Sequence, residues 1–271
     1  MKKLLLTSAA ASLLALPAAP ALAQAATPSY SLSGNLGITS NYIFRGITQT
    51  GGKPAVQGGF DFAHNSGLYA GTWLSNVSWL EDFGAYNRSS LEWDFYGGFK
   101  RNIGNTDFYY DLSTIYYYYP GSRNLGVVSA DTWEIAAAFG WKFLGVKYSY
   151  ALTNYFGAKP TGQDTDGSWY LDLFANYAIP NTGFAVFGNY GILKVRNDGT
   201  ELGATQASYN NWKIGASYTV QSGPVKDLEI GAFYSDTDVK NSAATGTNFY
   251  TDLSGYNTAK GTAVVYIKKA F

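Results

Sequence analysis

The sequence contains no cysteine and a single histidine, His64, and these absences exclude several classes of function. Without cysteine there is no disulfide framework, no thiolate metal site, no cysteine nucleophile and no lipid-carrying cysteine at an export cleavage site. A serine hydrolase needs a histidine beside its nucleophile, so chemistry of that kind could rest only on His64. The ordinary interpretation of His64 is an interfacial side chain at a turn, and no catalytic residue is predicted.

An excess of charge of one sign is also missing. Lysine and arginine together number 19, as do aspartate and glutamate, so no nucleic-acid partner is expected. No phosphate-binding glycine loop and no zinc spacing is present, and Asp164-Thr165-Asp166-Gly167 lacks the third oxygen ligand and the distal glutamate of a calcium loop. We therefore predict no cofactor and no metal, and we interpret that segment as a solvated surface loop.

The first 23 residues have the order of a secretory signal peptide. Two lysines precede an apolar stretch over residues 4–16, and the segment ends in Ala21-Leu22-Ala23. This order predicts export and cleavage before Gln24, and the two prolines in the segment disfavour a membrane anchor. Removal of 23 residues, two of them lysines, leaves 248 residues with 17 basic and 19 acidic side chains.

Long apolar runs are missing after residue 23, where no segment approaches the roughly 18 to 20 residues that a spanning helix requires. An exported chain without such helices is either a soluble periplasmic protein or a closed barrel, because lipid satisfies no backbone hydrogen bonds. Alternation decides between them. From Leu91 to Lys100 one face reads Leu, Trp, Phe, Gly, Phe, and the other reads Glu, Asp, Tyr, Gly, Lys. This pattern is typical of a strand between lipid and a polar interior, whereas the apolar face of a soluble sandwich forms its core.

Twelve segments of this kind are predicted, and their connections alternate in length. The predicted strands are 31–45, 55–64, 68–75, 91–101, 106–119, 132–143, 146–156, 169–179, 183–194, 211–220, 228–237 and 258–271. The short connections are 65–67, 102–105, 144–145, 180–182 and 221–227, and the long ones are 46–54, 76–90, 120–131, 157–168, 195–210 and 238–257. The expected fold is all-β: after a lead-in over 24–30, residues 31–271 form one antiparallel transmembrane barrel with short periplasmic turns and long extracellular loops.

The last strand ends in an aromatic residue, Phe271, and Ile267, Val265 and Ala263 lie on the same face, although Lys269 interrupts the pattern. This ending resembles the signal by which outer-membrane proteins reach the barrel-assembly machinery. Outer-membrane lipid and that machinery are therefore the expected partners, and the outer membrane of a Gram-negative bacterium is the expected location.

The first five predicted strands resemble the TorF family of predicted porins, a group of uncharacterised proteobacterial exported proteins. The matching residues are Gly34-Asn35-Leu36-Gly37, Ser40-Asn41-Tyr42-Ile43-Phe44-Arg45-Gly46, Gln49, 54–62, 67–76, 92–98 and Tyr110-Asp111. The resemblance is specific over about half of the barrel and implies an outer-membrane pore of unassigned substrate. It implies no catalytic residue.

The alternation divides the charges cleanly between the two faces. In the first predicted strand Leu32, Leu36, Ile38, Tyr42 and Phe44 are expected to face lipid. The residues expected to line the pore are Arg45, Asp61, Glu92, Asp94, Lys100, Asp107, Asp111, Glu134, Lys142, Lys147, Asp172, Lys213, Glu229 and Lys260. A lysine or arginine facing lipid at the midplane costs about 2 to 4 kcal/mol, which supports these faces. The same ladder of charges could also simply brace the barrel wall.

Twelve strands about 4.8 Å apart and tilted by about 40° close at a backbone radius of roughly 12 Å. Side chains of about 5 Å on each wall leave a gap on the order of 10 to 14 Å. Inward aromatic residues could form a solute-binding track or pack over inward glycines such as Gly59 and Gly71. These aromatic residues are Tyr69, Trp73, Tyr96, Tyr109 and Tyr117.

Arg45 is expected to end the first strand at the long-loop end and to face the lumen. Hairpin pairing places Gln57, Ser75 and Glu92 at a similar height on the next three strands. An unpaired guanidinium in a narrow bore is costly, so pairing with Glu92, Asp94 or Asp61 is expected. The pair would form either a constriction or a structural brace.

The favoured function is a passive channel for small hydrophilic solutes. The alternative is a barrel plugged by inward tyrosines or an infolded loop, which would act as a scaffold or a surface-interaction protein. An outer-membrane hydrolase is a remote third interpretation. The sequence leaves the solute and the oligomeric state open.

Overall fold

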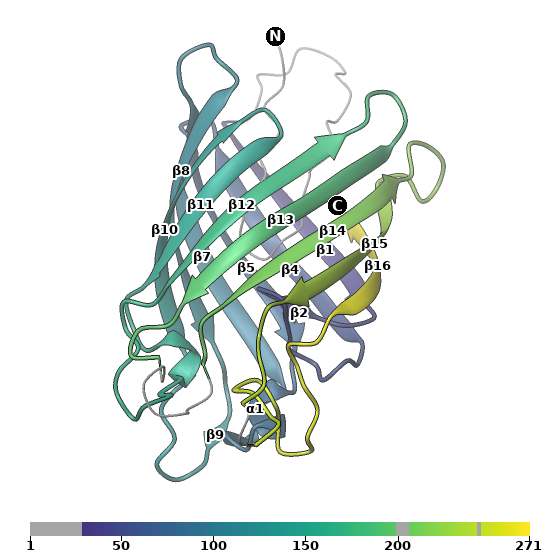
Figure 1. Cartoon of the computed structure of the whole chain (residues 1–271). Coiled ribbons are helices and arrows are strands. Elements are labelled where there is room, and N and C mark those ends of the chain that lie inside the picture. The colour runs from purple at the N-terminus through teal and green to yellow at the C-terminus, as the bar shows by residue number, and fades with distance from the viewer. Residues whose placement is uncertain (1–28, 199–205, 243–244) are drawn as a thin grey trace.

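A computed structural model describes residues 29–198, 206–242 and 245–271 as a closed antiparallel barrel (Figure 1). The barrel strands are β1 (Tyr30–Thr39), β4 (Ala55–His64), β5 (Leu68–Asn76), β7 (Leu91–Asn102), β8 (Phe108–Tyr118), β10 (Thr132–Trp141), β11 (Leu144–Ala151), β12 (Trp169–Ala178), β13 (Phe184–Lys194), β14 (Tyr209–Thr219), β15 (Leu228–Thr237) and β16 (Thr262–Ala270). Pairing of β1 with β16 closes the ring. The predicted twelve-stranded fold is confirmed, and the predicted signal peptide, residues 1–23, lies outside the described residues.

The remaining elements gather at one end of the barrel, at the bottom of Figure 1. They are β2 (Ile43–Phe44) paired with β3 (Ile47–Thr48), β6 (Tyr86–Arg88) paired with β9 (Ser122–Arg123), α1 (Trp79–Asp82) and the 3₁₀ turn η1 (Tyr155–Gly157). All of them belong to the long connections, so we call this the long-loop end and the opposite rim the short-turn end. No helix in the described ranges is long and apolar enough to cross a membrane.

The alternation seen in the sequence corresponds to an apolar outside and a polar inside. Ile214 on β14 is 63% exposed and Leu112 on β8 is 55% exposed, whereas Asp111, next to Leu112, is buried in the interior. Because transfer of apolar side chains out of water is favourable in free energy, this exposed apolar surface is suited to contact with hydrocarbon.

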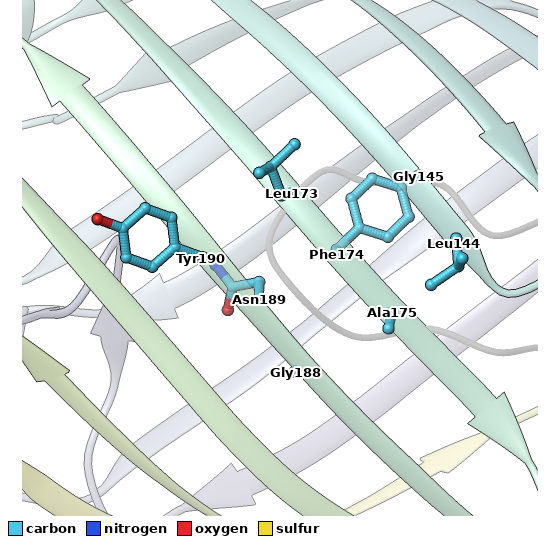
Figure 2. A pocket seen from close by; sticks show the side chains of 8 residues that line it. All are labelled: Leu144, Gly145, Leu173, Phe174, Ala175, Gly188, Asn189 and Tyr190. Carbon is cyan, nitrogen blue, oxygen red and sulfur yellow. The ribbon is translucent and has the colours of Figure 1, made fainter.

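A pocket lies at the barrel wall over β11, β12 and β13, lined by residues of both faces (Figure 2). The residues that line the pocket are Leu144, Gly145, Leu173, Phe174, Ala175, Gly188, Asn189 and Tyr190. Leu144, Leu173 and Tyr190 are each more than 40% exposed, and the small residues Ala175 and Gly188 lie on the same outward parity. The pocket carries no charged side chain, so we place the candidate site elsewhere.

Aromatic rings lie against the inner wall over glycines of neighbouring strands. Tyr96 lies over Gly71 and Tyr109 over Gly140, close enough that a Cβ on either glycine would collide with the ring. The same arrangement pairs Tyr69 with Gly98, Phe174 with Gly145 and Tyr266 with Gly231. Of the two roles left open for the inward aromatics, packing over glycine is found at Gly71. At Gly59 a Cβ would instead meet the β5 backbone at Thr72 and Trp73.

Three strand ends differ from the prediction by four to six residues. β1 ends at Thr39 rather than at residue 45, β11 ends at Ala151 rather than at 156, and β16 begins at Thr262 rather than at 258. In each case the alternation of residue types continues into a long connection that leaves the wall. Alternation alone therefore places the strand but not its end.

Candidate functional site

A short hairpin formed by β2 and β3 folds into the bore at the long-loop end. Its turn consists of Arg45 (φ 47°) and Gly46 (φ 84°), both in the left-handed region, which defines a type I′ turn. A Cβ on Gly46 would lie 2.7 Å from Thr237 Cγ2 on β15 and 2.8 Å from Asn211 Cβ on β14. The tip therefore touches the wall directly, and only glycine fits there. We call residues 42–50 the mouth hairpin.

The inward course of this segment overturns two face assignments. Tyr42 and Phe44, which were expected to face lipid, instead pack in the interior with inner-face rings of β5 and β8. Tyr42 stacks edge-on against Trp73 at 5.5 Å between ring centroids, and Phe44 against Tyr117 at 5.7 Å. The error arises because the chain leaves the wall after Thr39, so strand parity no longer applies.

Arg45 forms a bidentate ion pair with Glu134 on β10. Its Nη1 and Nη2 donate to Glu134 Oε1 and Oε2 at 2.8 and 2.7 Å, and their side chains are 8% and 2% exposed. The expected pairing with a carboxylate is thus found, but the expected partners Glu92, Asp94 and Asp61 are wrong. In the ring β10 lies five strands from β1 in one direction and seven in the other, so the ion pair crosses the bore.

The guanidinium of Arg45 is also surrounded by aromatic rings. Its central carbon lies 4.4 Å from the ring centroid of Tyr170, 4.9 Å from that of Phe44 and 5.7 Å from that of Tyr155. Nη1 donates to the Tyr155 hydroxyl at 3.1 Å. We call Glu134, Tyr155, Tyr170 and Phe44 the guanidinium socket.

Two further carboxylates lie in the interior of the mouth. Glu92 accepts the hydroxyl hydrogens of Tyr42 and Tyr119, both at 2.7 Å. Asp94 is 2% exposed, and its Oδ1 is buried without a hydrogen-bond partner among the described residues. An unsatisfied buried carboxylate oxygen costs free energy, so Asp94 is a point at which a donor could bind.

Apolar packing surrounds much of the mouth hairpin. One buried cluster joins Tyr42 to the inner-face rings of β8 and to Leu80 of α1. A second joins Ile47 to Tyr155, Tyr170 and residues of β13 and β14. Tyr209 of β14 also donates its hydroxyl hydrogen to the Arg45 carbonyl at 2.7 Å. The mouth hairpin is therefore held on several sides of the bore.

Ten predicted pore-lining residues lie on inner faces of the barrel strands. They are Asp61, Glu92, Asp94, Lys100, Asp111, Glu134, Lys147, Asp172, Lys213 and Glu229. Several have neutral partners: Tyr96 donates to Asp61 at 2.6 Å, Tyr69 to Asp111 at 2.8 Å and Asn189 to Asp172 at 2.8 Å. Whether they line a conducting pore stays a prediction.

One inward charge was missed. Lys268 of β16 pairs with Glu229 of β15 at 3.2 Å, and the Tyr266 hydroxyl donates to the same carboxylate at 2.7 Å. The sequence contains the information needed to place Lys268. Phe271 and Ile267 face outward, so strand alternation puts Lys268 on the inner face.

Besides Arg45, three expected pore-lining residues lie outside the strands, and their assignment to the inner wall is wrong. Asp107 and Lys142 belong to connections at the short-turn end, where their side chains are 62% and 50% exposed and 3.8 Å apart. Lys260 precedes β16 and is exposed, with its ammonium 4.2 Å from the Tyr256 ring centroid. The predicted strands were too long at these ends, and parity has no meaning in a connection.

His64 makes a local contact at the short-turn end. Its Nδ1 lies 2.8 Å from Ser66 Oγ, and the Ser66 backbone N–H donates to the same nitrogen at 3.1 Å. The contact thus closes the turn after β4, and neither residue lies near the mouth hairpin. Within the described part of the chain no group of three or more histidine or acidic residues could hold a metal ion.

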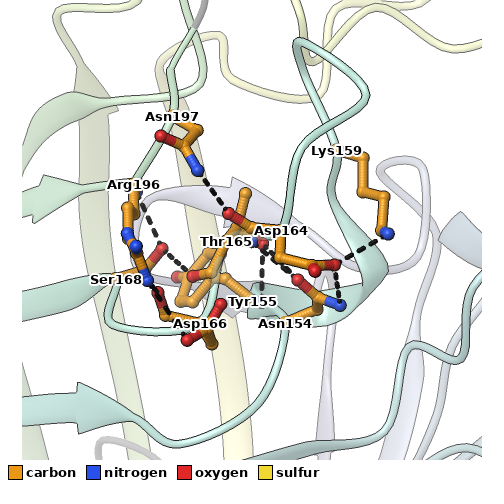
Figure 3. Close-up of polar contacts among 9 residues, drawn as sticks. All are labelled: Asn154, Tyr155, Lys159, Asp164, Thr165, Asp166, Ser168, Arg196 and Asn197. Carbon is orange, nitrogen blue, oxygen red and sulfur yellow. Dashed lines mark hydrogen bonds and ion pairs between the residues drawn. The ribbon is translucent and has the colours of Figure 1, made fainter.

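The long connection after β11 is cross-linked by polar contacts (Figure 3). Lys159 pairs with Asp164 at 2.8 Å, and Arg196 pairs with Asp166 at 3.2 Å. Hydrogen bonds from the Lys159 ammonium and the Asn154 amide lower the pKa of the Asp164 carboxyl. The carboxylates of the segment that partly resembles a calcium loop are therefore paired with basic side chains.

Comparisons with known proteins agree with the fold. A family model described as a bacterial protein of unknown function (Gcw_chp) matches residues 23–271. This match does not carry the TorF name, which stays a prediction. A search of curated proteins finds no match.

Among solved structures, the NanC porin is similar with 12% identity and a TM-score of 0.52, over 89% of this chain and 99% of that one. The outer membrane protein OprD from Pseudomonas aeruginosa has 16% identity and a TM-score of 0.40, over 91% and 67%. OccAB2 from Acinetobacter baumannii has 15% identity and a TM-score of 0.44, over 92% and 66%. At such identities the likeness concerns the fold alone.

Proposed function

The chain belongs to the Gcw_chp family of bacterial proteins of unknown function, and from the residues of its interior we propose that it is a porin-like passive channel for small hydrophilic solutes. We place it in the outer membrane of a Gram-negative bacterium, with the long-loop end outside the cell. The observation that carries the proposal is the charged inner face within an apolar outer surface.

The charges of the inner wall fit a wet bore better than a solid core. Asp61, Asp172 and Lys213 are all only partly buried, on three different strands. Burying charges in a dry core is expensive unless each is paired and hydrogen-bonded. Water and hydrated solutes in the bore would satisfy them.

The mouth hairpin supports a second candidate function. Its apolar packing and the buried Arg45–Glu134 pair fill the long-loop end of the bore. A barrel closed permanently in this way would act as a scaffold or a surface-interaction protein. The two functions differ in whether the mouth hairpin ever leaves the bore.

Planar-bilayer conductance and liposome swelling test the two functions. We expect the wild-type barrel to conduct in brief openings, and a variant with residues 42–50 replaced by a short glycine-serine link to conduct continuously. The expected gap without the hairpin is on the order of 10 Å, enough for monosaccharides and amino acids. If the hairpin-free barrel folds, shows heat-modifiable migration and admits no solute, the scaffold function replaces the channel.

Topology is tested by tags at the two ends. Gly162 lies at the long-loop end with φ 77° and open space around it, so a tag inserted there should leave the fold intact and be labelled on whole cells. A matched insertion at Ser66, in the turn after β4, should be labelled only after the outer membrane is permeabilised. Labelling of Ser66 on intact cells would invert the proposed orientation.

A further inference from the structure

The guanidinium socket has the composition of a ligand site, and its present occupant is a side chain of the same molecule. We propose that it binds solutes bearing a guanidinium group and that Arg45 occupies it as an internal ligand while the mouth is closed. The proposal rests on the channel function, because it names the class of solute that would release the mouth hairpin.

The geometry of the socket favours a guanidinium over other cations. Glu134 presents both carboxylate oxygens to two nitrogens at 2.7 and 2.8 Å, the planar fork that an ammonium cannot match. The Tyr170 ring at 4.4 Å adds a face on which a planar cation stacks. The Tyr155 hydroxyl accepts a third hydrogen bond at 3.1 Å.

Most of the socket stays in place when the hairpin moves. Glu134 belongs to β10, Tyr170 to β12 and Tyr155 to η1, so only Phe44 would leave with Arg45. Withdrawal of Arg45 would leave the carboxylate of Glu134 buried without its bidentate partner. This state is costly in free energy and therefore favours binding of another cation. Lys147 on β11 is the nearby wall cation, but it has no planar fork.

The mouth offers a second acceptor beside the socket. Asp94 Oδ1 is buried and has no hydrogen-bond partner among the described residues, and the charges of Glu92 and Glu134 act on this carboxylate. Three acidic side chains thus lie at the mouth with two basic ones, Arg45 and Lys147, an excess of acidic groups that favours a cationic ligand. A solute with an additional donor group could satisfy Asp94.

Arg45 competes with any such solute at a high local concentration, because a short tether corresponds to an effective concentration in the millimolar range. The backbone of the turn residue Arg45 is in the left-handed region, which costs free energy for residues other than glycine. This cost opposes occupation of the socket by Arg45. Solute binding should therefore be weak and exchange rapidly, as passage through a channel requires.

Binding of methylguanidinium to purified Arg45→Ala barrel in detergent tests the proposal. We expect methylguanidinium to raise the thermal unfolding midpoint of this variant in a saturable manner, whereas urea, a neutral planar analogue, at equal millimolar concentration should not. Adding Glu134→Gln should weaken the apparent affinity at least about tenfold, since the charged fork is lost. The wild-type barrel should respond less than Arg45→Ala because Arg45 fills its socket.

Equal responses to methylguanidinium and urea, or a response unaffected by Glu134→Gln, would overturn the proposal. If Arg45→Ala is not heat-modifiable, Arg45→Gln keeps the side-chain length and replaces it in the same titrations. A parallel bilayer recording separates the two claims: absence of conductance with retained binding refutes the channel but not the site. Conductance that methylguanidinium neither blocks nor alters, without binding, refutes the site alone.

Discussion

Glu134→Gln should increase the open probability of the channel by at least roughly 100-fold. Removing one partner of a buried ion pair typically costs about 3 to 5 kcal/mol, and about 1.4 kcal/mol corresponds to a factor of ten. The substitution leaves the Arg45 guanidinium, which is 8% exposed, opposite a neutral amide. Because only the closed arrangement contains this pair, the whole cost falls on the closed state. Single-channel recording in planar bilayers measures the change directly.

A double-mutant cycle decides whether the pair itself is responsible. Arg45→Ala should also open the channel, and the double variant Arg45→Ala/Glu134→Gln should open it less than the two single effects combined predict. Asp166→Asn is the matched control, because it removes an exposed carboxylate paired with Arg196. Additive effects of the two mouth variants, or an effect of Asp166→Asn of similar size, would contradict the closing role of the pair.

Ile214→Lys should prevent most of the protein from reaching the folded barrel. Ile214 lies at the middle of β14, is 63% exposed and faces outward. A lysine facing lipid near the midplane costs about 2 to 4 kcal/mol. The fraction of heat-modifiable protein after folding into liposomes, followed by urea titration, measures the loss.

Asn189→Lys is the matched control on the inner face of the adjoining strand. Asn189 pairs across the sheet with Lys213, and its amide donates to Asp172 at 2.8 Å. A lysine there gains the Asp172 carboxylate but faces Lys213, and because these two effects oppose each other we expect a change of roughly 1 kcal/mol or less. Equal losses for both variants would show that Ile214 does not face lipid.

The wall of the barrel could be predicted because successive residues of each strand alternate between lipid outside and the polar interior. The predicted bounds 55–64 and 228–237 coincide with β4 and β15. The predicted alignment of Gln57, Ser75 and Glu92 on neighbouring strands is confirmed. Each of these inferences needs only local hairpins and parity.

The mouth could not be predicted in the same way. Tyr42 and Phe44 keep the parity of Leu36 and Ile38, which conceals the turn into the bore, although Ser40 and Ile43 interrupt the alternation. The two-residue Arg45-Gly46 turn between Ile43-Phe44 and Ile47-Thr48 was the available signal for a hairpin. Glu134 could not be predicted as the partner of Arg45, because it belongs to a strand across the bore. Hairpin pairing relates only strands that are neighbours in the sequence.

The rings that lie over glycines also bear on how such a barrel assembles. A slip of one residue between two strands exposes the wrong face and is strongly penalised, but a slip of two preserves both faces. Tyr109 lies directly opposite Gly140, and a slip of two would set it against Ala138 or Lys142. Tyr266, opposite Gly231, would meet Glu229 or Phe233. Each ring fits only where the opposite residue lacks a Cβ, so these pairs reject the misaligned hairpins that hydrophobicity alone would accept.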